Sequence, residues 1–190
     1  MDIANLYQRA CDRFGDYTGM VRPGQWDGPT PCTGWDVRTL VNHLVYEDLW
    51  APPLLAGATM AEVGDRFDGD LLGTDPAGAY SQAAAAAVAA ARDRAALQRT
   101  VHLSFGDVPG EEYVWQLFGD HLIHGWDLAR AIGADEHLDP ELVAACAGWF
   151  APYEDAYRQA GAIGPRPDLP GDAGPQARLL AAFGRPAPGA

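Results

Sequence analysis

The chain has 190 residues, of which 48% are hydrophobic and 21% charged, a length that suits one well-buried domain and is short for two. Its net charge is −13, from 26 acidic and 13 basic residues, and every basic residue is an arginine. Because a basic patch is the electrostatic mark of nucleic-acid binding, this balance argues against a nucleic-acid partner. We therefore expect a single domain over residues 1–190.

The cysteines and the N-terminal segment bear on where the protein works. Cys11, Cys32 and Cys146 are widely spaced and form no CxxC pair, so a disulfide framework is not expected. The first residues lack the positive and apolar regions of a leader, and no stretch approaches about eighteen consecutive apolar residues. These features predict a cytoplasmic protein without a membrane partner.

The first half of the chain has helical periodicity interrupted by glycine and proline. Apolar residues recur at helical spacing over 3–17, which predicts an amphipathic helix of about five turns. A second helix is predicted to begin at Thr33 and Asp36, a variant of a capping box, and to end at the Pro52–Pro53 pair. Residues 54–74 are predicted to form a long connection with one helical turn near its middle.

An alanine-rich run follows this connection. Asp75-Pro76 is a cap followed by a first-turn proline, and it predicts a third helix over 77–97. Residues 100–103 are the only extended stretch that we expect. Residues 106–110 are expected to turn the chain into the next helix.

The second half of the chain is also predicted to be helical. A fourth helix is expected over 111–132 and is ended by Gly133, and a fifth, opened by Asp139-Pro140, is expected to reach about Phe150. A short helix is expected over 176–183. Four principal helices with one long crossover predict an all-α helix bundle, a fold in which metal sites are commonly built from inward-facing side chains.

Two histidine-bearing segments offer metal ligands. Asp120 and His124 are four residues apart, so on a helix they project from one face and can bind one ion. His43 is the candidate third ligand, because it borders the apolar stripe of the second helix. Two histidines and one carboxylate leave coordination positions open, as in catalytic zinc sites, and they also suit non-haem iron(II).

Titratable neighbours of these residues are candidates for further roles. Glu47, one turn beyond His43, is a candidate catalytic base, with ligand orientation and a structural ion pair as alternatives. His121 is a second catalytic candidate, with an outer-shell contact or a solvent-facing position as alternatives. Asp127 is a candidate hydrogen-bond partner of a ligand histidine, and its alternative is an ion pair with an arginine.

Two tryptophans and one cysteine complete the candidates. Trp35 and Trp126 are candidate substrate contacts, with ordinary core packing as the alternative. Cys32 precedes a predicted helix N-terminus, a position that lowers the pKa of a thiol. Because the sequence fixes no base beside Cys32, a packing role is preferred to a nucleophilic one.

Three segments together resemble the actinobacterial DinB-like metal-binding proteins, and in particular the group related to the N-terminal domain of mycothiol-dependent maleylpyruvate isomerase. They are the run from Pro29 to His43, the segment His124–Arg130, and Arg178-Leu179-Leu180 with Gly184-Arg185. The resemblance spans nearly the whole chain. It implies a DinB-like four-helix bundle that holds a divalent metal, zinc first with nickel or iron as alternatives, on one histidine of the second helix and two ligands of a later helix.

The resemblance also has departures. The later-helix ligand pair of the isomerase resembles Glu-x-x-x-His, whereas the shorter Asp120 stands at the matching position here, which implies a shifted metal and lets His121 compete as a ligand. The isomerase carries a second, C-terminal domain that this chain is expected to lack. The activity of the isomerase is therefore not assigned to this chain from the resemblance.

What the resemblance implies for function is a metal-dependent enzyme that activates a small thiol such as mycothiol, as an S-transferase or isomerase, or that activates water as a hydrolase. The alternatives are a non-catalytic binder of metal or small ligands, and an enzyme of a natural-product pathway that reuses the bundle pocket. The expected partner is a small-molecule substrate or thiol, and a homodimer is left open.

Overall fold

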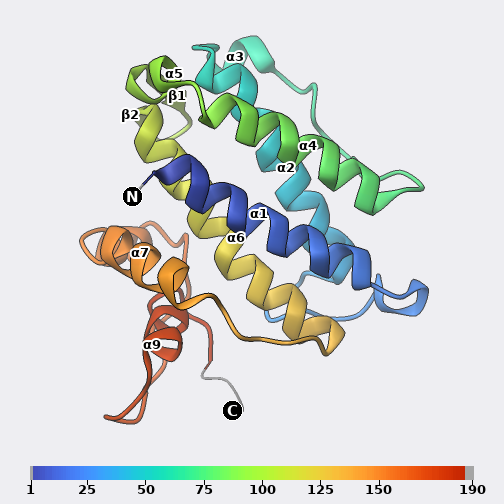
Figure 1. The fold of residues 1–190 in the computed structure, drawn as a ribbon, viewed down its shortest axis with the longest axis vertical. Helices are drawn as coiled ribbons and strands as arrows, with labels where there is room; N and C mark the ends of the chain where they lie inside the picture. Colours follow the sequence, from blue (N-terminus) through green and yellow to red (C-terminus); the bar gives the residue numbers. More distant parts are fainter. Residues whose placement is uncertain (1, 187–190) are drawn as a thin grey trace. The chain divides into compact units, whose positions relative to one another are not determined.

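The computed structural model describes residues 2–186. Its backbone contacts divide the chain into two compact units, Met1–Ala134 and Asp135–Ala190. The first unit is predominantly helical and the second contains shorter helices, and the long helices of the first unit run side by side (Figure 1). The expectation of a single domain over residues 1–190 stays a prediction.

Four long helices form the first unit. They are α1 (Ile3–Met20), α2 (Val37–Leu55), α4 (Pro76–Ala91) and α6 (Gly110–Ile132). α1 packs on α4 and α6, and α2 packs on the same two helices, which closes a four-helix bundle. The predicted all-α bundle is confirmed.

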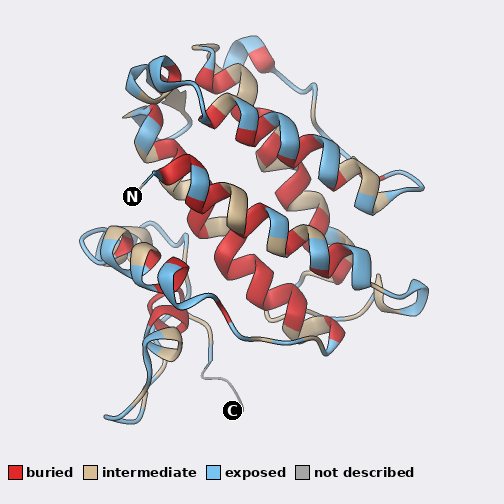
Figure 2. Cartoon of the chain, in the orientation of Figure 1, coloured by how far each residue is buried: buried red, intermediate tan, exposed pale blue. Residues whose placement is uncertain are grey.

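The buried faces of these helices meet inside the bundle (Figure 2). Each fully buried leucine or phenylalanine stabilises the fold by roughly 1.5–3 kcal/mol relative to an exposed one. The completely buried side chains of the core include Leu6, Tyr7, Phe14, Leu40, Leu44 and Phe118. The bundle is therefore held mainly by apolar burial, and the polar groups inside it need hydrogen-bond partners.

The two ends of α2 differ from the prediction. Asp36 is the N-cap, and its carboxylate accepts a hydrogen bond from the Thr39 N–H at 2.7 Å, whereas Thr33 lies in the preceding turn. The Pro52–Pro53 pair lies within the last turn, and the helix continues for two more residues. Proline removes a donor and keeps its acceptor, so the Pro52 carbonyl still accepts from the Ala56 N–H at 3.0 Å.

The crossover between α2 and α4 is attached to α2 by side chains. It contains one short helix, α3 (Met60–Val63), close to the predicted helical turn. The Arg38 guanidinium donates to the Asp70 carboxylate at 2.8 Å, and Asn42 accepts from the Leu71 N–H at 2.8 Å. These contacts hold the long connection against the helix that carries His43.

The alanine-rich segment is two helices instead of one. α4 ends at Ala91, and α5 spans Arg94–Gln98. Asp93 separates them, because its carboxylate accepts from the Ala95 N–H at 2.9 Å and so begins a new helix. The single helix predicted over 77–97 is therefore wrong at this break.

A two-stranded hairpin connects α5 to α6. β1 (Thr100–Leu103) pairs antiparallel with β2 (Gly106–Pro109). The extended stretch over 100–103 is confirmed, whereas residues 106–109 form a second strand where a turn was expected. A Cβ atom at Gly110 would collide with the Ala96 carbonyl oxygen, so only glycine fits where α6 begins.

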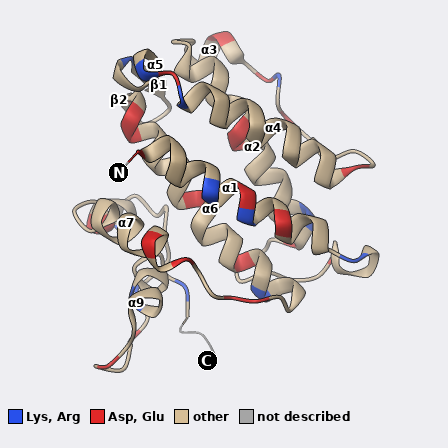
Figure 3. Ribbon diagram, viewed as in Figure 1, with Lys and Arg blue, Asp and Glu red and all other residues tan. Residues whose placement is uncertain are grey.

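The second unit contains α7 (Pro140–Phe150), α8 (Glu154–Gln159) and α9 (Pro175–Ala182). α7 and α9 match the predicted helices, and α8 was not predicted. The rings of Phe150 and Phe183 stack with centroids 3.9 Å apart. Acidic residues occur in both units (Figure 3). Within residues 2–186, no helix combines the length and the apolar character that crossing a membrane requires.

Candidate metal centre

Within the described residues, three groups of side chains place metal-ligand atoms within 4.8 Å of one another. The first is the predicted set, which joins one residue of α2 to two of α6. The second shares a histidine with the first, and the third is completely buried. Their members are His43, Asp120 and His124; Cys32, His124 and Asp127; and Cys11, Asp48 and His121.

The predicted ligand set comes together across the interface of α2 and α6. Nε2 of His43 lies 3.5 Å from Oδ2 of Asp120, and the rings of His43 and His124 are nearly perpendicular with centroids 5.2 Å apart. The side chains of His43 and Asp120 are 25% and 43% exposed. A small molecule can therefore reach this group from solvent.

The charges within this group favour a bound cation. Burial alone would raise the pKa of Asp120, but the hydrogen bond to His43 and the charges of His124 and His43 outweigh it and lower that pKa to about 2. Burial disfavours the charged form of His43, yet the hydrogen bond and charge of Asp120 raise its pKa above the usual value. The negative charge of Asp120 that stabilises a charged imidazole would equally attract a divalent ion.

Glu47 lies close enough to this group to be affected by its charges. Burial is the largest cause, and with repulsion from Asp120 it raises the pKa of Glu47 to about 7. A carboxyl group with a pKa near neutrality can both accept and release a proton at neutral pH. The role of Glu47 as a base stays a prediction.

His124 is oriented by a hydrogen bond on its far nitrogen. Nδ1 of His124 lies 2.9 Å from Oδ2 of Asp127, which is completely buried. The Cys32 thiol donates to the same Asp127 oxygen at 3.2 Å, and its Sγ lies 3.7 Å from Nδ1 of His124. A carboxylate at Nδ1 leaves Nε2 as the nitrogen that could bind a metal, so the hydrogen bond to His124 is present and its role beside a ligand histidine stays a prediction.

A short loop brings Trp35 and Cys32 to the same place. Its ends are joined by a bridge between Pro29 and Asp36, and the Trp35 carbonyl accepts from the Thr30 N–H at 3.1 Å. The half-buried Trp35 ring stacks on His124 with centroids 5.8 Å apart and lies 4.9 Å from the His43 ring. Trp35 thus forms an aromatic wall beside both histidines.

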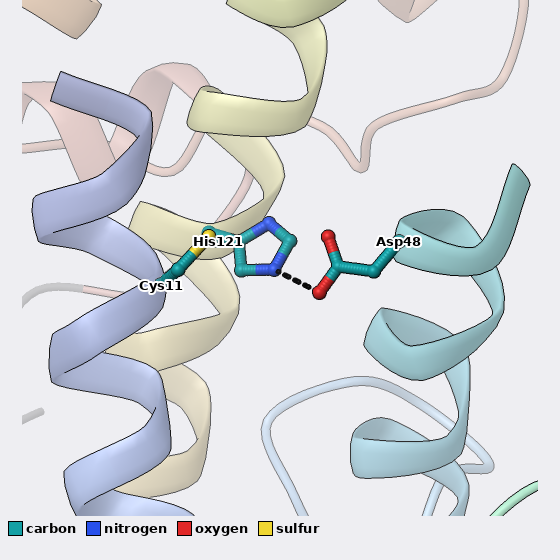
Figure 4. A group of neighbouring side chains, drawn as sticks. All are labelled: Cys11, Asp48 and His121. Atoms are coloured by element: carbon teal, nitrogen blue, oxygen red, sulfur yellow. Dashed lines mark hydrogen bonds and ion pairs between the residues drawn. The ribbon is translucent and has the colours of Figure 1, made fainter. Parts of the chain in front are cut away.

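Two other candidates lie elsewhere. Trp126 is completely buried, with the Arg130 guanidinium 5.3 Å from its ring centroid, so it offers no surface to a substrate. His121 is also completely buried and belongs to the third group (Figure 4). Neither the catalytic role of His121 nor the substrate contact of Trp126 is supported by these surroundings, because both side chains face the interior.

The buried group contains a residue that sequence reasoning missed. Nε2 of His121 lies 3.2 Å from Oδ2 of Asp48, and the Tyr7 hydroxyl donates to the other oxygen of Asp48. Burial would lower the pKa of His121, but the charge of Asp48 raises it well above the usual value. A signal for Asp48 was present, because it follows Leu44 by four residues and so lies on the apolar stripe of α2.

Solved structures define the class of this fold. The crystal structure of a mycothiol-dependent maleylpyruvate isomerase matches with a TM-score of 0.71 and 17% identity, over 96% of this chain and 88% of that chain. A mutant of that enzyme matches with a TM-score of 0.69 and 16% identity, over 95% and 87%. The chain therefore has the DinB-like fold of this enzyme. The match extends over most of the isomerase chain, and the expectation that this chain lacks the second domain of the isomerase stays a prediction.

Sequence comparison gives the family. The family model of the mycothiol maleylpyruvate isomerase N-terminal domain matches residues 7–129. Two uncharacterised proteins of Mycobacterium tuberculosis, one from strain CDC 1551 / Oshkosh and one from strain H37Rv, are each 35% identical over 146 residues, which is 75% of this chain and 74% of theirs. The chain belongs to the mycothiol maleylpyruvate isomerase N-terminal domain family, and the recognition made from its motifs is confirmed.

Proposed function

We propose that this protein is a metal-dependent enzyme that activates a small thiol, such as mycothiol, for reaction with an electrophilic substrate. The observation that carries the proposal is the convergence of His43, Asp120 and His124 at a solvent-accessible point of the bundle. The family and the isomerase that shares the fold support the thiol as the co-substrate.

The donor set fits a divalent ion. Two imidazole nitrogens and one carboxylate oxygen are the ligands of open zinc sites and of non-haem iron(II), and nickel accepts imidazole as well. His43, Asp120 and His124 would hold the ion, with zinc as our first expectation. When bound, such an ion lowers the pKa of a coordinated thiol or water, so that the anion is present near neutral pH.

The chain's own residues supply the remaining functions. Glu47, with its pKa near 7, accepts the proton that the thiol or water releases. Asp127, which lies 2.9 Å from Nδ1 of His124, would fix that ring and leave its Nε2 available to the ion. Trp35 covers the two ligand rings and presents an apolar face to the substrate. All of these residues belong to the first unit, so substitutions in the bundle are enough to test the proposal.

The first experiment measures metal content in protein purified without a metal-binding tag. We expect about one ion per chain in the wild type and a loss of that ion in His43→Ala and His124→Ala. His137→Ala is the matched control, because His137 is an exposed histidine that pairs with Asp135 and belongs to none of the three groups. Metal retained in both ligand variants would contradict the proposed site.

The second experiment measures turnover with mycothiol and maleylpyruvate, followed by other thiols and electrophiles. Reaction should require both the ion and the thiol and should be lost on removal of the ion by a chelator. Undiminished turnover in the metal-free sample would refute metal-dependent chemistry. Tight binding of a thiol that remains chemically unchanged would identify a binding protein instead.

A further inference from the structure

The buried residues Asp48 and His121 directly follow residues of the candidate metal centre in the sequence. Asp48 directly follows Glu47 in α2, and His121 directly follows Asp120 in α6. Each of the two helices therefore presents one polar side chain to the candidate centre and the next one to the interior. Figure 4 shows His121 and Asp48 pointing at each other from their two helices, with Cys11 of α1 beside them.

The hydrogen bonds of this pair leave it little freedom. Nδ1 of His121 donates to the Leu117 carbonyl at 2.9 Å, one turn earlier in α6, so the ring is fixed relative to its own helix. Nε2 of His121 lies 3.2 Å from one oxygen of Asp48, and the Tyr7 hydroxyl of α1 donates to the other. The bridge thus joins α1, α2 and α6 through one carboxylate.

The surroundings of the bridge are apolar and aromatic. The side chains of Asp48 and His121 are both 0% exposed, and the rings of Tyr7, Phe14 and Tyr80 lie within 6.1 Å of the His121 ring. In such surroundings a displaced carboxylate or imidazole would lose its partner without gaining water, which is costly. Buried polar pairs of this kind can fix the register of two helices, where apolar contacts alone would allow them to slide.

We propose that Asp48 and His121 are positioning residues, whose buried hydrogen bond fixes the spacing and rotation of α2 against α6 and thereby the approach of His43 to Asp120 and His124. The proposal rests on the proposed function only for its metal-bound test. Its other test uses the metal-free protein, so that failure of one can be told from failure of the other.

The test compares Asp48→Asn with Tyr80→Phe. Asp48→Asn keeps the shape of the side chain and weakens the bridge. The control Tyr80→Phe removes a buried hydrogen bond of the same region, from the Tyr80 hydroxyl to the Cys11 carbonyl at 3.0 Å, and leaves the bridge intact. Tyr7→Phe, which removes the hydrogen bond from Tyr7 to Asp48 and leaves the one between Asp48 and His121, is the milder second variant and decides the matter if Asp48→Asn does not fold.

The first readout is the NMR signal of the imidazole nitrogens of His43 and His124 in metal-free protein. We expect these signals to move in Asp48→Asn, and less in Tyr7→Phe, but not in Tyr80→Phe. The second readout is the visible spectrum of bound Co²⁺ together with the affinity for Zn²⁺. We expect an altered spectrum and about tenfold weaker binding in Asp48→Asn, at the lower end of the effect of residues that support ligands.

Two results would overturn the proposal. The first is folded Asp48→Asn, or Tyr7→Phe in its place, with the wild-type imidazole signals and the wild-type Co²⁺ spectrum. The second is two ions per wild-type chain, with one lost in Cys11→Ser, because the buried group would then itself be a metal site. A wild type without metal would refute the proposed function, while the imidazole signals would still decide whether Asp48 positions the histidines.

Discussion

Replacement of Asp127 by alanine should weaken metal binding although His43, Asp120 and His124 are all retained. The carboxylate holds Nδ1 of His124 at 2.9 Å and also accepts from the Cys32 thiol. A hydrogen bond to a charged group contributes about 1.5–3 kcal/mol, and 1.4 kcal/mol corresponds to a factor of ten in affinity. We therefore expect Asp127→Ala to bind Zn²⁺ roughly 10- to 100-fold more weakly, as is usual for partners of metal-binding histidines.

The assay is a competitive titration of Zn²⁺ against a chromophoric chelator. Asp127→Asn should fall between the wild type and Asp127→Ala, because the amide oxygen can still accept from Nδ1 but carries no charge. Asp135→Asn is the control, since it removes the carboxylate of an exposed pair with His137 that belongs to no ligand group. An Asp127→Ala protein that is folded and binds Zn²⁺ as tightly as the wild type would refute the reasoning.

Three further predictions concern the centre and the bundle. Asp120→Glu should keep the ion and shift the spectrum of bound Co²⁺, whereas Asp120→Asn should bind Zn²⁺ more than about tenfold more weakly because the charge is lost; equal affinities would contradict a ligand role. Folded Glu47 keeps its proton up to about pH 7, whereas an unfolded glutamate releases it near 4.5, so the folded state binds more protons in this window. Urea unfolding of metal-free protein should thus show the wild type losing stability relative to Glu47→Gln as the pH rises from 4.5 to 7, and a constant difference would argue against the raised pKa. Phe14→Ala should lower the free energy of unfolding by about 3–5 kcal/mol and Phe14→Leu by less, because the ring is completely buried between Tyr80 and His121; a loss under about 1 kcal/mol would mean that the cavity refills.

The sequence predicts the elements that have a strong local signal. The long helices follow from apolar periodicity, and α6 was placed within one residue because Gly133, in a left-handed conformation, ends it. The break at Asp93 was missed, because alanine favours helix throughout and one capping carboxylate decides where a new helix starts. Strand β2 was missed because a four-residue strand exists only through its partner.

In the candidate metal centre, too, the residues with a local signal were predicted, whereas those that depend on tertiary contacts were not. Asp120 and His124 could be paired from their spacing alone. His43 could be added as the third ligand because this required one assumption, that the second helix packs on the helix that carries His124. The spacing did not show whether the side chain of His121 faces the candidate centre or the interior of the bundle, because a histidine is polar wherever it lies on a helix. Its burial depends on Asp48 and Tyr7, which lie 73 and 114 residues earlier in the chain, and only the tertiary structure brings them together.

The candidate centre draws its side chains from two short stretches, residues 32–47 and 120–127. Within each stretch the arrangement is local, so a single long-range event, the docking of α2 on α6, assembles everything at once. Few loop closures are then needed before the ligands meet. Copying these two stretches, together with the pair Asp48 and His121, into another four-helix bundle should therefore reproduce the candidate centre.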